Sequence, residues 1–324
     1  MEKGLILNII ILVGAGFVLV RSSVLVIESL MNLSRIFKLR EYILSFVLMS
    51  FATTLPDFSL GINAVLSGNP LLALGNVLGA NLVTNGLILG FLAVLSGGIV
   101  IDKKVAAHDA WLTFALSVAP VFLLLDGRLG RFEGLFLLIR FVAYLLKLVR
   151  FEEKEIIRHS ALLKLVEKNP ASYLRSFLKS FFLFVAGAAL VLASSYFVVR
   201  GMESISDSFG IPDFTLGIFA LGLGTSLPEL IFGVRSLVVR HSGLSLGNLI
   251  GSAALTSTLI LGMVAVFSPI EIELNYDFAV VSISMVVVLF LSHLFLRTGS
   301  RVNRREGILL LTIYVIFAVL QFLF

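Results

Sequence analysis

The chain has 324 residues, of which 58% are hydrophobic and only 14% charged, and its mean hydropathy is +1.06. A soluble globular domain is typically about half apolar and a quarter charged, so this composition excludes a soluble domain and indicates an integral membrane protein. The absence of cysteine excludes disulfides and thiolate metal sites. The net charge of +5 does not indicate nucleic-acid binding, because Lys and Arg fall in short segments between apolar runs.

Apolar runs near the length of a membrane-crossing helix follow one another along the chain, which favours an all-α integral membrane fold over a β-barrel. The ten predicted transmembrane helices cover residues 4–27, 42–66, 70–95, 105–125, 131–150, 176–200, 214–238, 242–266, 277–297 and 305–324. No Ala-x-Ala-like cleavage pattern accompanies the first run, so we expect it to be a retained helix rather than a removed signal peptide.

The long hydrophilic stretch at residues 151–175 separates five predicted spans from five others. An odd number of spans in each half makes the second half enter the membrane from the opposite face. We therefore predict two inverted five-helix repeats, with an N-terminal repeat at 1–150, a linker at 151–175 and a C-terminal repeat at 176–324. The linker either rests on the membrane surface through a partial apolar face or is a simple solvated connection.

Basic residues between the predicted spans are concentrated on one side of the membrane. That side would carry Arg35, Lys38, Arg40, Lys103, Lys104, the basic residues of the linker, Arg235, Arg240, Arg297, Arg301, Arg304 and Arg305. The other side would carry Lys3, Arg128, Arg131 and Arg200. The positive-inside rule then places the linker in the cytoplasm and both termini outside a cell membrane.

The second and seventh spans carry the same motif, 172 positions apart. Residues 52–57 read Ala-Thr-Thr-Leu-Pro-Asp, and residues 224–229 read Gly-Thr-Ser-Leu-Pro-Glu. The following spans repeat a second element, Gly-Asn-Val-Leu-Gly-Ala-Asn at 75–81 and Gly-Asn-Leu-Ile-Gly-Ser-Ala at 247–253. A carboxylate inside an apolar span is costly and is a functional-site hypothesis by default. Two carboxylates in matched repeats, each next to a proline, indicate a binding site at the repeat interface.

The motifs supply many oxygen donors at membrane depth. Pro56 and Pro228 cannot donate to the carbonyl four residues earlier, so each should loosen its helix near Ala52 and Gly224. Carboxylate, hydroxyl and amide oxygens suit a hard cation such as Ca²⁺, and two carboxylates would balance one divalent charge. The candidate ligands are Asp57, Glu229, Thr53, Thr54, Thr225, Ser226, Thr84, Ser252, Thr256, Asn76 and Asn248. The Gly-x-x-x-Gly spacing of the second element permits close backbone approach to the loosened helices.

Structural interpretations compete with these functional ones. Gly-x-x-x-Gly is common in ordinary membrane-helix packing, and intramembrane Ser and Thr usually bond to their own helix. Asp57 and Glu229 have no basic partner at similar depth in the second, third, seventh or eighth span, which disfavours a structural salt bridge. The histidines His108, His159, His241 and His293 lie near predicted loops without metal-ligand spacing, and we expect them at the surface.

On these residues the sequence resembles the cation/Ca²⁺ exchanger superfamily, specifically its prokaryotic Na⁺/Ca²⁺ exchanger branch. The resemblance extends to Ile101-Asp102-Lys103, to Asp126-Gly127 and to the segment 305–309. It implies ten helices in two inverted repeats, ions bound between helices two, three, seven and eight, and alternating access by sliding of helices one and six. It places the acidic ligands at Asp57 and Glu229.

The sequence departs from that family pattern in both repeats. The first motif has Ala52 for Gly, Thr54 for Ser and Asp57 for Glu, and Ala80 lacks a hydroxyl. Thr84 and Thr256 stand where related exchangers usually carry Asn and Asp. A shorter carboxylate and fewer charged oxygens should change the size and charge of the site, and with them the coupling to sodium.

The resemblance implies a transporter and not an enzyme, with no cofactor. The expected partners are inorganic cations, Ca²⁺ and Na⁺ or H⁺, and the lipid bilayer, with no nucleic acid and a monomer sufficient for transport. A H⁺/Ca²⁺ or other cation exchanger is the main alternative, because burial favours the neutral, protonated form of a carboxylate. An intramembrane aspartyl protease would also use two carboxylates, but the chain lacks a Gly-x-Gly-Asp-like element. A passive channel is disfavoured because inverted repeats with broken helices favour alternating access.

Overall fold

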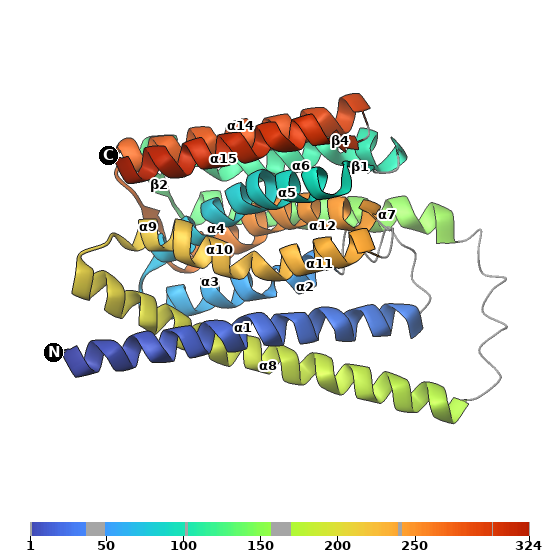
Figure 1. Ribbon diagram of the computed structural model, residues 1–324, viewed down its shortest axis with the longest axis horizontal. Coiled ribbons are helices and arrows are strands. Elements are labelled where there is room, and N and C mark those ends of the chain that lie inside the picture. The colour runs from blue at the N-terminus through green and yellow to red at the C-terminus, as the bar shows by residue number, and fades with distance from the viewer. Residues whose placement is uncertain are drawn as a thin grey trace.

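A computed structural model shows a bundle of helices, and it describes residues 2–36, 49–100, 103–156, 170–238, 242–299 and 301–323 (Figure 1). The first half contains α1 (Glu2–Ile36), α2 (Ser50–Thr53), α3 (Leu55–Ser67), α4 (Pro70–Leu82), the π-helical turn η2 (Val83–Ile88), α5 (Leu89–Ser96), α6 (Lys103–Leu123), the 3-10 turn η3 (Leu124–Asp126) and α7 (Arg131–Ile156). The second half contains α8 (Pro170–Phe209), α9 (Asp213–Leu216), the π-helical turn η5 (Gly217–Leu221), α10 (Gly222–Thr225), α11 (Leu227–Val238), α12 (Ser242–Leu255), the π-helical turn η6 (Thr256–Ile260), α13 (Leu261–Phe267), α14 (Tyr276–Gly299) and α15 (Arg304–Leu323). The all-α fold expected from the composition is confirmed.

Six helical segments of the described residues are long and apolar enough to cross a membrane. They are Asn8–Leu33, Pro70–Ser96, Leu174–Phe209, Asp213–Val238, Ser245–Phe267 and Tyr276–Arg297. The shortest has 22 residues, or about 33 Å of helix at 1.5 Å per residue, which exceeds a hydrocarbon core of about 30 Å. The chain is therefore a multi-pass integral membrane protein. Helix α7 packs in the same bundle but is not one of the six segments. It carries Arg140 and Lys147 along its length, and these charged residues lower its hydropathy.

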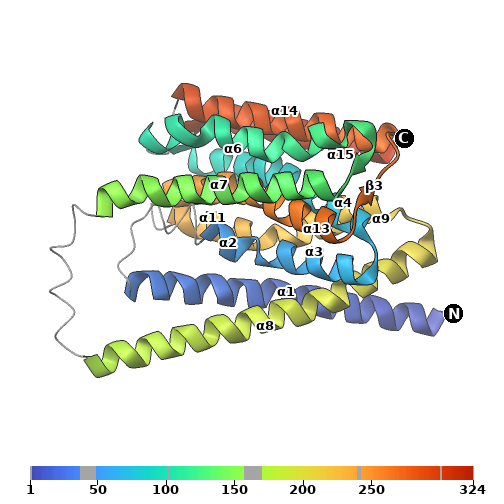
Figure 2. The same cartoon turned by 180° about the vertical axis from the view of Figure 1, so that it is seen from behind.

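The bundle has a buried centre and a peripheral pair of helices. In the α4–α5 and α12–α13 segments, 83% of the most apolar stretch is buried, against 22% in α1 and 33% in α8. Helices α1 and α8 run side by side along one face in both views (Figure 2). Their outward side chains are large and apolar, and Phe17 is 66% exposed. This face is suited to contact with lipid.

The two peripheral helices are longer than the sequence predicted. Helix α1 continues to Ile36 rather than ending at 27, and α8 has 40 residues and continues to Phe209 rather than 200. Helix α7 also continues to Ile156, and α8 already begins at Pro170, so both ends of the predicted 151–175 linker are helical. The reason at the first end is that Glu and Lys, which fill residues 152–155, are strong helix formers. Residues 157–169 lie outside the described part of the chain.

Close glycine contacts in the two halves match at a nearly constant offset. A Cβ on Gly90 of α5 would lie 2.8 Å from the carbonyl oxygen of Gly307 of α15. A Cβ on Gly262 of α13, 172 positions after Gly90, would lie 3.0 Å from the carbonyl oxygen of Gly134 of α7. The contacts are reciprocal, because Gly134 and Gly307 meet the carbonyl oxygens of Gly262 and Gly90 at 2.8 Å each. Each half thus places its own glycine against a helix of the other half.

Two small antiparallel sheets also join one half of the chain to the other. Strand β1 (Gly98–Val100) pairs with β4 (Arg301–Asn303), and β2 (Arg128–Leu129) pairs with β3 (Ile270–Glu271). Adding 172 or 173 positions to β1 and β2 reaches β3 and β4, so the second sheet repeats the first with the halves exchanged. The β1–β4 sheet and strand β2 lie at opposite ends of the bundle in Figure 1.

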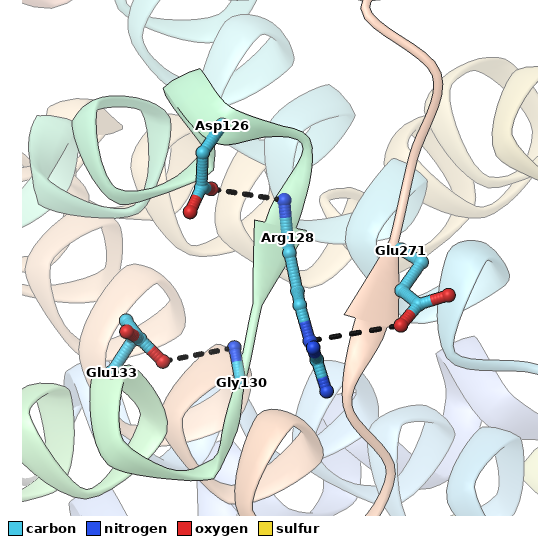
Figure 3. A network of polar contacts seen from close by, with 5 residues as sticks. All are labelled: Asp126, Arg128, Gly130, Glu133 and Glu271. Atoms are coloured by element: carbon cyan, nitrogen blue, oxygen red, sulfur yellow. Dashed lines mark hydrogen bonds and ion pairs between the residues drawn. The ribbon is translucent and has the colours of Figure 1, made fainter.

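The turn that leads into α7 is held by side-chain caps (Figure 3). The Arg128 amide donates to the Asp126 carboxylate at 3.1 Å, and the Gly130 amide donates to Glu133 Oε2 at 3.1 Å. Arg128 also lies 3.6 Å from Glu271 of β3, which joins the two strands by an exposed ion pair. The cap recurs before α15, where the Asn303 amide donates to Glu306 Oε2 at 2.7 Å.

Candidate cation-binding site

Both motif helices are interrupted beside their prolines. Helix α2 ends at Thr53 and α3 begins at Leu55, and Thr54 between them has φ −84° and ψ 0°. Ser226 separates α10 from α11 with φ −83° and ψ −3°. Both residues lie in the bridge region, off the helical minimum. The loosening predicted from Pro56 and Pro228 is therefore present in both halves, at equivalent residues.

The two carboxylates are buried in the centre of the bundle. Asp57 and Glu229 are each 2% exposed, and neither forms a salt bridge within the described residues. Each lies in the first turn of its helix, where the positive end of the helix dipole favours a negative charge. All the other predicted ligands are buried as well, and none is more than 4% exposed.

Asn76 of α4 connects the carboxylate of one half to a hydroxyl of the other. Its Nδ2 donates to Asp57 Oδ1 at 2.7 Å, and its Oδ1 accepts from Thr225 Oγ1 at 3.3 Å. The amide thus links α3 to α10, two helix fragments that are far apart in the sequence. The matching arrangement puts Thr53 Oγ1 within 3.2 Å of Asn248 Oδ1, so Asn248 of α12 receives a hydroxyl of α2.

The two halves differ in the contact between the asparagine amide and the carboxylate. Asn76 donates to Asp57, but the equivalent Asn248 Nδ2 has no hydrogen-bond partner among the described residues, and neither has Glu229 Oε2. A buried donor and a buried acceptor without partners are both costly. Glu229 therefore keeps a free carboxylate oxygen inside the protein, which a bound cation would satisfy.

The remaining predicted ligands make contacts across the bundle and within their own segments. Thr84 of η2 and Ser226, between α10 and α11, bring their hydroxyl oxygens within 3.5 Å of each other, and Thr256 lies 3.5 Å from the amide nitrogen of Asn81. Thr54, Ser252, Ser226 and Thr256 each also donate to a carbonyl oxygen of their own segment, at 2.7 to 3.1 Å. Such bonds use the hydroxyl hydrogen and leave oxygen lone pairs, so they do not prevent a role as ligands.

Glycines bring the α4 backbone directly against the broken helix of the other half. A Cβ on Gly75 would lie 2.2 Å from the Phe214 carbonyl oxygen, and one on Gly79 would lie 2.2 Å from that of Ile218. Gly217 meets the Leu72 carbonyl oxygen at 2.5 Å in return. The close approach predicted from the Gly-x-x-x-Gly spacing is confirmed for this element. The structure gives no corresponding contacts for Gly247 and Gly251 among the described residues.

Two features of the structure were not predicted. His293, expected at the surface, is 1% exposed, because its Nδ1 meets the Leu289 carbonyl oxygen at 2.7 Å and its ring packs against Phe114. The side chains of His108, His159 and His241 lie outside the described part. Ser257 was also not predicted as a site residue, although it stands 172 positions after Asn85, just as Thr256 stands 172 positions after Thr84.

The arrangement is suited to binding a cation through oxygen. Among the described residues, no group of three or more His, Cys, Asp or Glu side chains could hold a metal ion. Soft transition metals prefer thiolate and imidazole ligands, whereas Ca²⁺ and alkali ions accept carboxylate, amide, hydroxyl and carbonyl oxygens. Two carboxylates among neutral oxygens therefore fit the second class of ion.

Known proteins are similar to this chain in sequence and in fold. In sequence, the chain is 29% identical to the sodium/calcium exchanger MaX1 of Methanosarcina acetivorans, over 97% of this chain and 98% of that protein. It is 28% identical to the inner membrane protein YrbG of Escherichia coli, over 86% of this chain and 85% of that protein.

Solved structures agree with the sequence relatives. The sodium-calcium exchanger NCX_Mj matches with a TM-score of 0.68 and 25% identity, covering 97% of this chain and 98% of that one. The H⁺/Ca²⁺ exchanger CAX matches with a TM-score of 0.76 at 16% identity, covering 98% of this chain and 86% of that one, which shows the shared fold alone. A family model described as sodium/calcium exchanger protein matches residues 7–149 and 179–323, which is most of the chain. The chain therefore belongs to the sodium/calcium exchanger protein family.

Proposed function

We propose that this protein is a secondary-active antiporter that exchanges Ca²⁺ for Na⁺ across the membrane by alternating access. The observation that carries the proposal is the buried pair Asp57 and Glu229 in two broken helices, with Asn76 bonded to Asp57 and to Thr225 of the other half. The family and the relatives with names of known activity are those of transporters and not of enzymes. Ca²⁺ and Na⁺ are then substrates rather than cofactors.

The proposed architecture is ten transmembrane helices in two inverted repeats, residues 1–150 and 176–324, joined by a linker at 151–175. The exchanged sheet pairing and the reciprocal glycine contacts, all at an offset of 172 or 173, support it. The positions of the sheets also fit this orientation. Strands β1 and β4 lie in connecting segments assigned to the cytoplasm, and β2 and β3 lie in connecting segments assigned to the outside. Both termini are then outside and the linker is cytoplasmic.

Cysteine accessibility tests this orientation, since the chain has no native cysteine. Glu271→Cys in β3 and Arg301→Cys in β4 replace exposed residues of the two sheets. An impermeant maleimide should label Glu271→Cys in intact cells, but should label Arg301→Cys and the linker variant Ser160→Cys only after permeabilisation. The reverse pattern would overturn the orientation, and labelling of Glu271→Cys and Arg301→Cys from one side would overturn the inverted repeat.

The proposed ion ligands are the two carboxylates with the hydroxyls Thr53, Thr54, Thr225, Ser226, Thr84, Ser252 and Thr256 and the amides Asn76 and Asn248. Their burial and their contacts across the two halves support this assignment. One Ca²⁺ would neutralise both carboxylates. The transport cycle needs no partner beyond the cations and the bilayer, and one chain carries a complete site.

Exchange of Ca²⁺ for H⁺ is the second candidate, because Thr84 and Thr256 stand where acid or amide ligands are usual in related exchangers. With two carboxylates only, several sodium ions would leave the site with excess positive charge, whereas a proton can neutralise one carboxylate. The deciding experiment is ⁴⁵Ca²⁺ uptake into proteoliposomes under a Na⁺ gradient or a pH gradient imposed separately. Uptake driven by Na⁺ alone supports the first function, uptake driven by the pH gradient supports the second, and uptake under neither would overturn both.

Thr256→Asp should strengthen the dependence of Ca²⁺ uptake on sodium, because it adds a third charge at a residue 3.5 Å from Asn81. Like charges a few ångströms apart cost several kcal/mol in a partly dry cavity unless a cation separates them, so the added carboxylate should recruit Na⁺. The expected result is a several-fold lower half-saturating Na⁺ concentration, measured in the same vesicles, with Thr256→Asn as the uncharged control. Steep, cooperative sodium dependence already in the wild type, with no response to pH, would contradict this account.

A further inference from the structure

One face of α14 presents large apolar side chains and ends in an arginine. Ile283, Val287 and Phe290 are each at least 39% exposed, and Arg297 is exposed beyond them. Successive spacings of four, three and seven residues place all four side chains on one side of the helix. Val287 precedes Arg297 by ten residues, or about 15 Å of helix, which is half of a hydrocarbon core of about 30 Å. The face therefore matches the depth of one leaflet, with Arg297 at the level of the lipid headgroups.

Aromatic rings of α6 hold the Arg297 side chain at this level. Its guanidinium carbon lies 5.6 Å from the ring centroid of Trp111, whose ring is 5.5 Å from that of Phe114 and 6.0 Å from that of Phe290. A guanidinium stacked on an aromatic ring keeps its N–H groups available at its edge. Arg297 forms no ion pair with another described residue. The fork of N–H groups is therefore free to bind a phosphate through two oxygens.

Three more arginines follow Arg297 at the same end of the bundle, where β4 joins α14 to α15 (Figure 1). Arg301 of β4 and Arg304 and Arg305 of α15 are exposed, and none of them forms an ion pair within the described part of the chain. The proposed orientation places this end in the cytoplasm, where the facing leaflet carries anionic lipids. Clusters of about four or more basic residues beside a membrane helix are typical of anionic-lipid recognition.

We propose that this face of α6 and α14 binds an anionic phospholipid of the cytoplasmic leaflet. Arg297 contacts the phosphate, and an acyl chain lies along Phe290, Val287 and Ile283. The four arginines select a negatively charged headgroup over a zwitterionic one. The occupant is a lipid and not a dissolved anion, because only an acyl chain would cover the apolar part of the face. None of these residues belongs to the proposed cation site, so the inference rests only on the proposed orientation.

Trp111 is the only tryptophan of the chain and is half-buried beside the exposed Phe290, so its fluorescence reports directly on this face. The full-length protein is reconstituted in dioleoyl phosphatidylcholine vesicles, and phosphatidylglycerol or phosphatidylcholine with brominated acyl chains is added in increasing proportion. Bromine quenches tryptophan on contact, so the mole fraction at half-maximal quenching reports the affinity for each lipid. We expect a several-fold lower value for phosphatidylglycerol. Arg297→Gln should raise that value about fivefold, or about 1 kcal/mol, and leave the phosphatidylcholine value unchanged.

Arg128→Gln is the matched control, because it removes an exposed arginine from β2 at the other end of the bundle and should leave both values unchanged. Each variant is compared with its own emission before quenching, since loss of the stacked guanidinium changes the brightness of Trp111. Equal quenching of the wild type by the two lipids would overturn the site, as would an unchanged Arg297→Gln. An equal loss in Arg128→Gln would show attraction to the overall charge and overturn it too. Quenching by neither lipid would mean that something else, such as a second copy of the chain, covers the face, which also overturns the proposal. Transport is not part of the readout, so failure of the proposed exchange activity would be seen separately.

Discussion

Asp57→Asn and Glu229→Gln should each abolish ⁴⁵Ca²⁺ exchange in proteoliposomes while the purified protein remains folded. Either change removes one of the two charges that would balance the ion. Breaking a buried charge pair by removing one partner costs about 3–5 kcal/mol, which is more than about a hundredfold in affinity. The fold should survive, because Asn at position 57 still offers an oxygen to Asn76, and Glu229 Oε2 has no partner to lose within the described residues.

Glu271→Gln is the matched control, since it also removes a carboxylate but at an exposed residue of β3 whose ion pair with Arg128 is at the surface. Exposed ion pairs contribute about 0–1 kcal/mol, so exchange should be close to wild type. Elution as a single species in size-exclusion chromatography establishes that the inactive variants are folded. Full exchange by Asp57→Asn or Glu229→Gln would remove that residue from the site.

Gly79→Ala should strongly disrupt the packing of the bundle centre. The new Cβ would lie 2.2 Å from the carbonyl oxygen of Ile218, and both groups belong to helix backbones that cannot rotate away. Overpacking a core usually costs about 1–3 kcal/mol even where side chains can adjust, so a contact with backbone should exceed that range. We expect a large loss of folded protein after detergent extraction and a lower melting temperature, followed by fluorescence-detected chromatography across a temperature series.

Gly14→Ala on α1 is the control, because nothing lies within 4 Å of a Cβ built there. Alanine is the better helix former by about 1 kcal/mol, so this change should be neutral or slightly stabilising. Wild-type stability of Gly79→Ala would mean that α4 and η5 do not cross at backbone contact.

Much of the candidate site was predictable because the acidic residue and the proline of each repeated motif act within their own helix. Asp57 and Glu229 stand next to proline at the same offset, and Pro56 and Pro228 remove backbone donors whatever surrounds them. The helix interruptions at Thr54 and Ser226 follow directly. The ends of α1 and α8 were not predictable, since helix propensity continues past the apolar run into polar residues at the membrane surface.

Periodicity in a sequence assigns a residue to a face of its own helix, but not to a partner on another helix. His293 illustrates the limit, because its position near a loop indicated the surface, whereas the packing of α6 against α14 buries its ring against Phe114. Asn81 illustrates it again, because only the tertiary structure brings its amide nitrogen within 3.0 Å of the Ser257 hydroxyl in the other half.

The sequence by itself determined that this is a multi-helix membrane protein with one acidic, proline-interrupted motif in each half, because hydropathy, proline geometry and buried charge act within a single helix. Only the tertiary structure decided that Asn76 joins Asp57 to Thr225, while Asn248 Nδ2 and Glu229 Oε2 have no partner among the described residues. The physical reason is the register between crossing helices, which decides which residues meet. Contacts between the halves depend on where one helix crosses another, and that crossing is set by glycines such as Gly79 meeting a distant backbone, which no local pattern records.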